Sequence, residues 1–174
     1  MKHILPLLAL VASPAFAGGH AAGLDGATVV ITNTFQGAQT ENAEVDVTAF
    51  GLLNNRFATV GGDVEFPAFI TLYDVDISAD AIAFTWGDSD FAKQLGGPTP
   101  EGNHDRNYFV FDLPEDKAIT AVTFDTDASE MIEGSAAPTA SIIGPNRIVT
   151  DFSAGVIRGQ GFNPIFKVTV GDAG

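Results

Sequence analysis

Pairs of aspartates separated by a single residue recur along this chain, at or near the ends of expected strands. The pairs are Asp74 with Asp76, Asp88 with Asp90, and Asp125 with Asp127. Residues two apart on an extended chain share a face, so each pair directs two carboxylates toward one point. Calcium binds about six to eight such oxygen ligands, which makes Ca²⁺ a candidate ligand that stabilises the fold. The alternative is that these acids form only the solvated face of half-buried strands.

A loop rich in glycine and proline gathers polar side chains of several kinds. It runs from Leu95 to Arg106, the longest stretch without strand character, and carries Glu101, Asn103, His104, Asp105 and Arg106. Asn103 and Asp105 repeat the spacing of the aspartate pairs. Long loops on a rigid scaffold commonly carry binding residues, so we treat these five as candidate ligand-binding residues. The alternative is a plain surface connection.

The single tryptophan, Trp86, lies directly before Gly87 and Asp88. An exposed indole ring there could stack on a sugar, which together with the loop predicts a carbohydrate-binding module as an alternative function. The competing interpretation is a core tryptophan, because Trp86 continues the face formed by Ile82 and Phe84.

Catalytic motifs are poorly matched. The segment Gly87-Asp88-Ser89-Asp90-Phe91 lacks the final glycine of a nucleophile elbow, and anions surround its serine. Two carboxylates such as Glu65 and Glu101 keep a glycoside hydrolase as a third alternative. Because the chain has 22 acidic residues, such pairs also arise by chance. We therefore expect a protein that is not an enzyme.

The start of the chain has the pattern of a bacterial secretory signal. A short basic start precedes an apolar run and a small-x-small site, which predicts cleavage after Ala17. The mature chain would begin Gly18-Gly19-His20, whose amine, amides and imidazole could bind Cu(II) or Ni(II) in a plane. The alternative is a glycine-rich spacer. No later segment is apolar over the length of a membrane span, so we expect an exported protein, periplasmic or extracellular, without a transmembrane segment.

The balance of charge excludes one large class of partner. The 174 residues include 22 Asp and Glu but 8 Lys and Arg, a formal net charge of −14. Loss of Lys2 with the signal leaves 7 cations and a net charge of −15. Nucleic-acid binding requires a basic face that so few cations cannot form. The chain has no cysteine, so no disulfide or thiolate metal site can stabilise the exported protein.

Period-two alternation predicts about nine strands and hence one all-β domain, a β-sandwich of jelly-roll type. This domain is expected over residues 27–171. It would follow a signal peptide (1–17) and a flexible N-terminal segment (18–26). The expected strands are Ala27–Thr34, Glu44–Phe50, Phe69–Ile77, Ala81–Trp86, Tyr108–Leu113, Ile119–Asp125, Ala140–Ile143, Arg147–Phe152 and Ile165–Val170. Tyr108 to Phe111 is apolar on both faces, which predicts a central, covered strand. One short helix is expected near Ser129 to Glu133.

Several segments resemble the secreted β domains that Gram-negative bacteria join to a PEP-CTERM-type sorting tail. They are Gly61 to Phe66, Asp74 to Ser78, Ile82 to Phe84, Asn107 to Leu113, Ile119 to Phe124 and Ile148 to Gly155. Phe166 to Gly174 departs from that family, since it holds no Pro-Glu-Pro signal, apolar helix or basic cluster. The resemblance implies an extracellular or envelope role and supplies no catalytic residue. We therefore expect a non-enzymatic exported protein that binds or builds part of the envelope or extracellular matrix.

Overall fold

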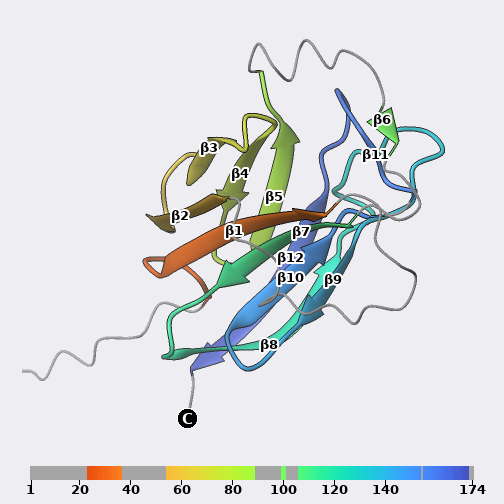
Figure 1. Ribbon diagram of the computed structural model, residues 1–174. Helices are drawn as coiled ribbons and strands as arrows, with labels where there is room; N and C mark the ends of the chain where they lie inside the picture. Colours follow the sequence, from red (N-terminus) through yellow and green to blue (C-terminus); the bar gives the residue numbers. More distant parts are fainter. Residues whose placement is uncertain (1–22, 37–53, 89–98, 101–105, 154, 173–174) are drawn as a thin grey trace, which may run out of the picture.

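The protein is an all-β sandwich with two antiparallel five-stranded sheets. The computed structural model describes residues 23–36, 54–88, 99–100, 106–153 and 155–172. In the first sheet the strand order is β2 (Asn54–Thr59), β1 (Thr28–Gln36), β7 (Arg106–Asp112), β10 (Arg147–Asp151), β9 (Thr139–Ile142). In the second it is β3 (Phe66–Phe69), β4 (Tyr73–Ile77), β5 (Ala81–Trp86), β12 (Ile165–Asp172), β8 (Lys117–Phe124). A short pair, β6 (Thr99–Pro100) with β11 (Ile157–Arg158), lies beside them (Figure 1).

Aromatic side chains from the two sheets fill the space between them. Phe84 of β5 and Phe109 of β7 face each other with ring centroids 5.0 Å apart, and Phe152 lies 4.8 Å from the first and 4.9 Å from the second. These pairs are inclined rather than stacked face to face, as the quadrupoles of aromatic rings favour. The alternation predicted from the sequence therefore assigns most phenylalanines correctly to the core.

Strand β7 is central and buried on both faces, as its sequence predicts. It lies between β1 and β10, and Phe109 and Phe111 point into the aromatic core. On the opposite face Tyr108 and Val110 are buried with Val149 of β10 in a second, smaller cluster. A continuous apolar run is thus typical of a strand that is covered on each side.

The strand expected over Phe69 to Ile77 is wrong as one element. A tight turn divides this region into β3 and β4. Three residues of the turn that are not glycine have positive φ: Ala68, Ile70 and Thr71, at 49°, 48° and 64°. The Thr71 N–H donates to the Ala68 carbonyl at 2.9 Å, which closes the turn. Residues 68–71 contain no glycine or proline, and Pro67 lies just before them in β3, so the sequence from Phe69 onward predicts one continuous strand.

The short helix expected near Ser129 to Glu133 is also wrong. Glu130 instead forms an isolated antiparallel bridge with Asn163, with backbone hydrogen bonds of 3.1 and 2.8 Å in the two directions. The Asn163 side-chain amide also donates to a Glu130 carboxylate oxygen at 2.7 Å. These long-range contacts hold the segment extended.

The described domain begins before Ala27 and includes part of the segment expected to be flexible. Leu24 is fully buried in the main core, and its N–H donates to the Ala79 carbonyl at 2.8 Å. Gly23 has a φ of 93°, and a Cβ there would lie 2.3 Å from the Ala79 oxygen. Residues 23–26 are therefore packed. Residues 1–22 and the strand expected at Glu44–Phe50 lie outside the described residues.

Within the described part of the chain, no helix is long and apolar enough to cross a membrane.

Candidate functional site

Strand β4 carries the first aspartate pair on its outward face. Tyr73, Val75 and Ile77 are buried, whereas Asp74 and Asp76 are half-buried on the opposite side. This alternation confirms the strand pattern on which the pair was predicted. Asp74 Oδ1 accepts the Ala68 N–H at 2.7 Å, so its carboxylate holds the strained turn before β4.

Glu65 binds more backbone amides than any aspartate of the predicted pairs in the described chain. Its Oε1 accepts the N–H groups of Gly61 and Gly62, each at 3.0 Å, and its Oε2 accepts the Ile77 N–H at 2.7 Å. One carboxylate therefore links the loop after β2 to the end of β4, and we call this set of three hydrogen bonds the Glu65 clamp. The sequence signal that could have revealed the Glu65 clamp is the Gly61-Gly62 pair three residues before Glu65, because glycine backbone can approach a carboxylate closely.

Asp76 lies next to this clamp and shares a hydrogen bond with Glu65. Burial, this hydrogen bond and the charge of Glu65 together raise the pKa of Asp76, and the charge of Asp63 adds to the effect. For Glu65, burial acts to raise the pKa, but the amides of Ile77, Gly61 and Gly62 and the contact with Asp76 outweigh it and lower the pKa. The sequence did not predict this pairing, since the two residues are separated by a strand and a turn.

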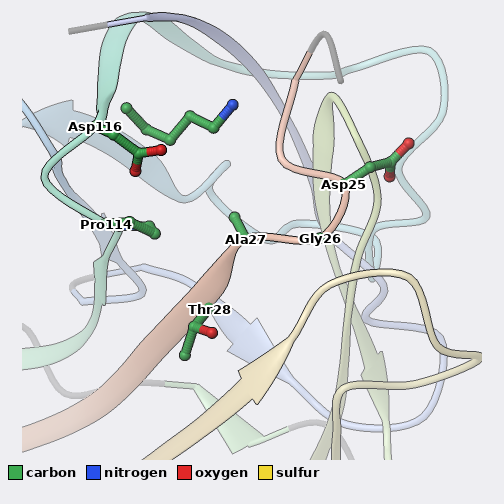
Figure 2. A pocket seen from close by; sticks show the side chains of 7 residues that line it. Asp25, Gly26, Ala27, Thr28, Pro114 and Asp116 are labelled. Carbon is green, nitrogen blue, oxygen red and sulfur yellow. The ribbon is translucent and has the colours of Figure 1, made fainter. Parts of the chain in front are cut away.

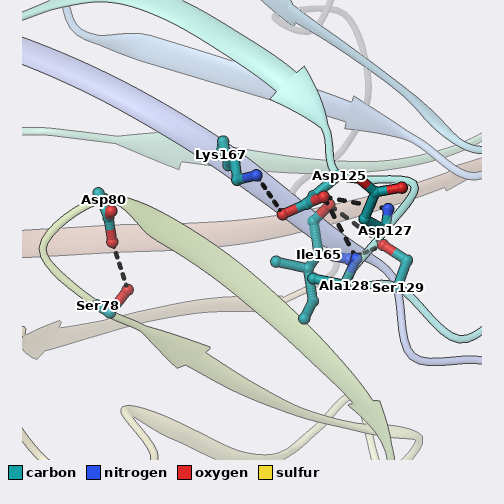
Figure 3. A network of polar contacts seen from close by, with 8 residues as sticks. All are labelled: Ser78, Asp80, Asp125, Asp127, Ala128, Ser129, Ile165 and Lys167. Carbon is teal, nitrogen blue, oxygen red and sulfur yellow. Dashed lines mark hydrogen bonds and ion pairs between the residues drawn. The ribbon is translucent and has the colours of Figure 1, made fainter.

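Asp125 has a structural role in a network at the start of β12 (Figure 3). It is only 8% exposed, and its Oδ2 lies 2.7 Å from Lys167 Nζ. Its Oδ1 accepts the N–H groups of Asp127 and Ala128 at 3.2 and 3.3 Å. The hydrogen bond from Lys167 is the main cause that lowers the pKa of Asp125, and the same contact raises the pKa of Lys167.

The three aspartate pairs thus differ in what surrounds them. Asp125 already contacts a cation, the Lys167 ammonium, and Asp127 is exposed. Asp88 is exposed, while Asp90 lies outside the described residues. Among the described residues, no group of three or more His, Asp or Glu side chains is placed to hold a metal ion.

Most of the other predicted site residues lie outside the part of the chain that the structure describes. Gly18, Gly19, His20, Glu101, Asn103, His104 and Asp105 lie outside the described residues. Arg106 is the first residue of β7 and pairs with Gln36 of β1. The loop from Leu95 to Arg106 therefore stays a prediction as a binding element.

Trp86 is half-buried and packs against the main core. It is the register partner of Tyr73, and the two rings meet edge to face with centroids 5.5 Å apart. The next residue, Gly87, lies close to the backbone just before β4. Its N–H donates to the Leu72 carbonyl at 2.6 Å, and a Cβ on it would lie 3.0 Å from that oxygen. The core interpretation of Trp86 explains these contacts.

A pocket that the sequence did not predict lies at the end of the sandwich where β1 begins. Its volume is about 410 Å³, and it is lined by Asp25, Gly26, Ala27, Thr28, Pro114, Asp116 and Lys117. We call these seven residues the base pocket. Figure 2 shows Asp116 and Pro114 on one wall, Ala27 and Gly26 opposite them, and the Asp25 carboxylate turned away from the other aspartate. The residues come from two segments far apart in sequence, which is why no local motif reveals them.

Comparison of the chain with protein-family models, curated protein sequences and solved structures finds no match in any of the three.

Proposed function

We propose that this chain is an exported, non-enzymatic β-sandwich protein with a binding or structural role in the cell envelope or extracellular matrix. The observation that carries the proposal is that acidic side chains hold the scaffold together. The carboxylates of Glu65, Asp74 and Asp125 each accept backbone N–H groups of nearby loops. Their oxygens thus tie exposed and part-buried backbone donors of these loops to the scaffold, in a chain that has no disulfide.

The arrangement of Glu65 and Asp76 does not suit glycoside hydrolysis. Glycosidases place two carboxyl groups about 5–5.5 Å apart for retention or about 6.5–9.5 Å apart for inversion of configuration. Glu65 and Asp76 lie beside each other and interact directly, closer than either arrangement requires. The lowered pKa of Glu65 also keeps it ionised, whereas a general acid must hold its proton near the working pH.

The export part of the proposal rests on the N-terminal pattern of a basic start, an apolar run and a small-x-small site. An acidic surface keeps an exported domain soluble and free of nucleic acid, and it suits neutral or cationic matrix components. The resemblance to secreted β domains of the PEP-CTERM type supports the same location.

Expression of the full chain in a Gram-negative host tests this proposal. We expect mass spectrometry to find a mature protein that starts at Gly18, and cell fractionation to place it outside the cytoplasm. The purified mature protein should then co-sediment with isolated envelope or extracellular polysaccharide without releasing reducing ends. Retention in the cytoplasm, or hydrolysis that Glu65→Gln abolishes, would overturn the proposal.

Stabilisation by calcium is a separate part of the proposal. The half-buried carboxylates of Asp74 and Asp76 share one face of β4, where an added cation would offset their charge. A bound ion at a hundredfold excess over its dissociation constant would add about 2.7 kcal/mol to the free energy of unfolding. Melting of the mature protein in chelator and in millimolar Ca²⁺ measures this, and identical melting temperatures would contradict it.

A further inference from the structure

Four side chains on the outer face of the first sheet are buried although they point away from the aromatic core. Tyr108 and Val110 of β7 and Val149 of β10 are 3%, 4% and 2% exposed and form the second, smaller cluster. Val110 is the register partner of Val149 on one side and of Thr32 of β1, which is 5% exposed, on the other. The four side chains therefore lie next to one another on three neighbouring strands (Figure 1). We call these four residues the outer patch.

The side chains of the outer patch cannot bury one another completely. Side chains on one face of a sheet stand roughly perpendicular to it, so neighbours cover their flanks but not their tips. Burial this complete requires another layer of chain above the sheet. The large buried apolar residues of the described connecting segments, such as Leu24, Val60 and Phe162, lie in the main core. We therefore look for the covering layer among residues outside the described ranges.

Residues 37–53 join β1 to β2 and leave the sheet beside the outer patch. β1 ends at Gln36 and β2 begins at Asn54, and Thr34 near the end of β1 is the register partner of Tyr108. A hairpin needs only about two to five connecting residues, so this connection is far longer than the turn requires. Eight extended residues span about 26 Å, which is ample to cross the patch and to return to β2.

The sequence of this connection suits an apolar surface. Val45, Val47 and Ala49 alternate with polar residues, so an extended chain would present the three on one side. Leu52 and Leu53 follow directly before β2. This composition differs from that of most surface connections, in which polar residues, glycine and proline dominate.

The other segments outside the described ranges fit the outer patch less well. Residues 101–105 include no apolar residue, and alanine is the only apolar type in residues 18–22 and 173–174. Residues 89–98 include two large apolar residues, but they follow β5, which belongs to the second sheet. Apolar residues and a place next to the outer patch therefore favour residues 37–53.

We propose that residues 37–53 lie across the outer patch as a third layer, with their apolar side chains on Val110 and Val149. This layer stops short of the sheet edge, because Phe57 of β2, the partner of Val30 on the same face, is 77% exposed. The inference goes beyond the proposed function. It implies that the centre of this face is not the surface that meets an envelope or matrix partner.

Single introduced cysteines test the proposal, because the chain has no cysteine of its own. The experiment compares the rates at which a thiol reagent labels Val149→Cys, in the outer patch, and Phe57→Cys, exposed on the same face. We expect Val149→Cys to react at least about a hundredfold more slowly, because its thiol is reached only after local opening. Replacing residues 38–52 by a short Gly-Ser linker should bring its rate to within about tenfold of that of Phe57→Cys.

Two further variants separate loss of the covering layer from loss of the fold. Ile148→Cys lies next to Val149 but points into the main core, so it should stay slow in the shortened chain. Val45→Ser with Val47→Ser in the full-length chain should also speed the labelling of Val149→Cys. That pair of substitutions gives the decision if the shortened chain does not fold.

Three results would overturn the inference. Val149→Cys could react as fast as Phe57→Cys in the full-length chain, which would mean that nothing covers the patch. It could stay slow in a monomer in spite of both changes to residues 37–53, which would assign the cover to another segment. Its protection could also disappear on dilution together with a dimer, which would identify a second copy of the chain as the cover.

Discussion

The carboxyl groups of Glu65 and Asp76 lie beside each other, and their surroundings move the two pKa values in opposite directions. Three backbone amides stabilise the ionised form of Glu65. Burial, and after it the interaction with Glu65, raises the pKa of Asp76. Both side chains reach solvent, which limits the size of the effect.

Asp76→Asn should stabilise the protein at neutral pH by about 0.5 kcal/mol, because it removes like-charge repulsion at a partly exposed site. The pKa of Asp76 is raised in the folded protein, so the wild type loses stability as the pH rises through that value. The advantage of the variant should therefore be absent below the ordinary aspartate pKa of about 3.9 and appear above the raised one. Urea denaturation across this range measures it.

Asp74→Asn is the control for that experiment, since Asp74 lies on the same face of β4 but binds the Ala68 N–H. An equal gain in both variants, or a gain for Asp76→Asn that does not change with pH, would show that the contact with Glu65 is not the cause.

Thr71→Gly should raise the free energy of unfolding by about 1 kcal/mol. Thr71 has a φ of 64°, and a left-handed backbone costs a residue with a Cβ about 1–2 kcal/mol that glycine does not incur. Thr85, exposed on extended strand β5, is the comparison, because glycine there should destabilise the protein. Thermal melting distinguishes the two, and a loss of stability in Thr71→Gly would refute the strained-turn interpretation.

Lys167→Met should destabilise the protein at neutral pH, because it leaves the buried carboxylate of Asp125 without its ammonium partner. The pKa of Asp125 is lowered in the folded protein, so the stability that this pair contributes is present above the unfolded aspartate value and is lost as the pH falls. The difference between variant and wild type should shrink in acid. A double variant with Asp125→Asn should show less than the sum of the single losses, and simple additivity would argue against the pair.

Leu24→Ala should cost about 2–5 kcal/mol, the usual penalty for truncating a fully buried leucine. This result would establish that the domain begins at the packed residues before β1. Val64→Ala, at an exposed apolar position, is the control and should change stability by less than about 0.5 kcal/mol. Guanidinium denaturation of the two variants compares them directly.

The all-β class and most strands followed from the sequence alone, because alternation of apolar and polar residues is a local property of an extended chain. Strand β5 matches its expected bounds of Ala81 and Trp86, and β7 is central because its residues are apolar on both faces. The turn at Ile70 and the bridge of Glu130 to Asn163 escaped prediction. Neighbouring strands and distant backbone groups impose these conformations, and residues 69–73 and 129–133 contain no glycine or proline that would mark a turn.

The sequence also determined where carboxylates lie on β4, since residues two apart on a strand must share a face. Only the tertiary structure decided what each acid contacts: Asp76 for Glu65, Lys167 for Asp125, and the lining shared with Gly26 for Asp116. Spacing along one strand is set by the geometry of the backbone. Contacts between segments depend on how the sheets pair and pack, which is decided by the burial of the whole aromatic core.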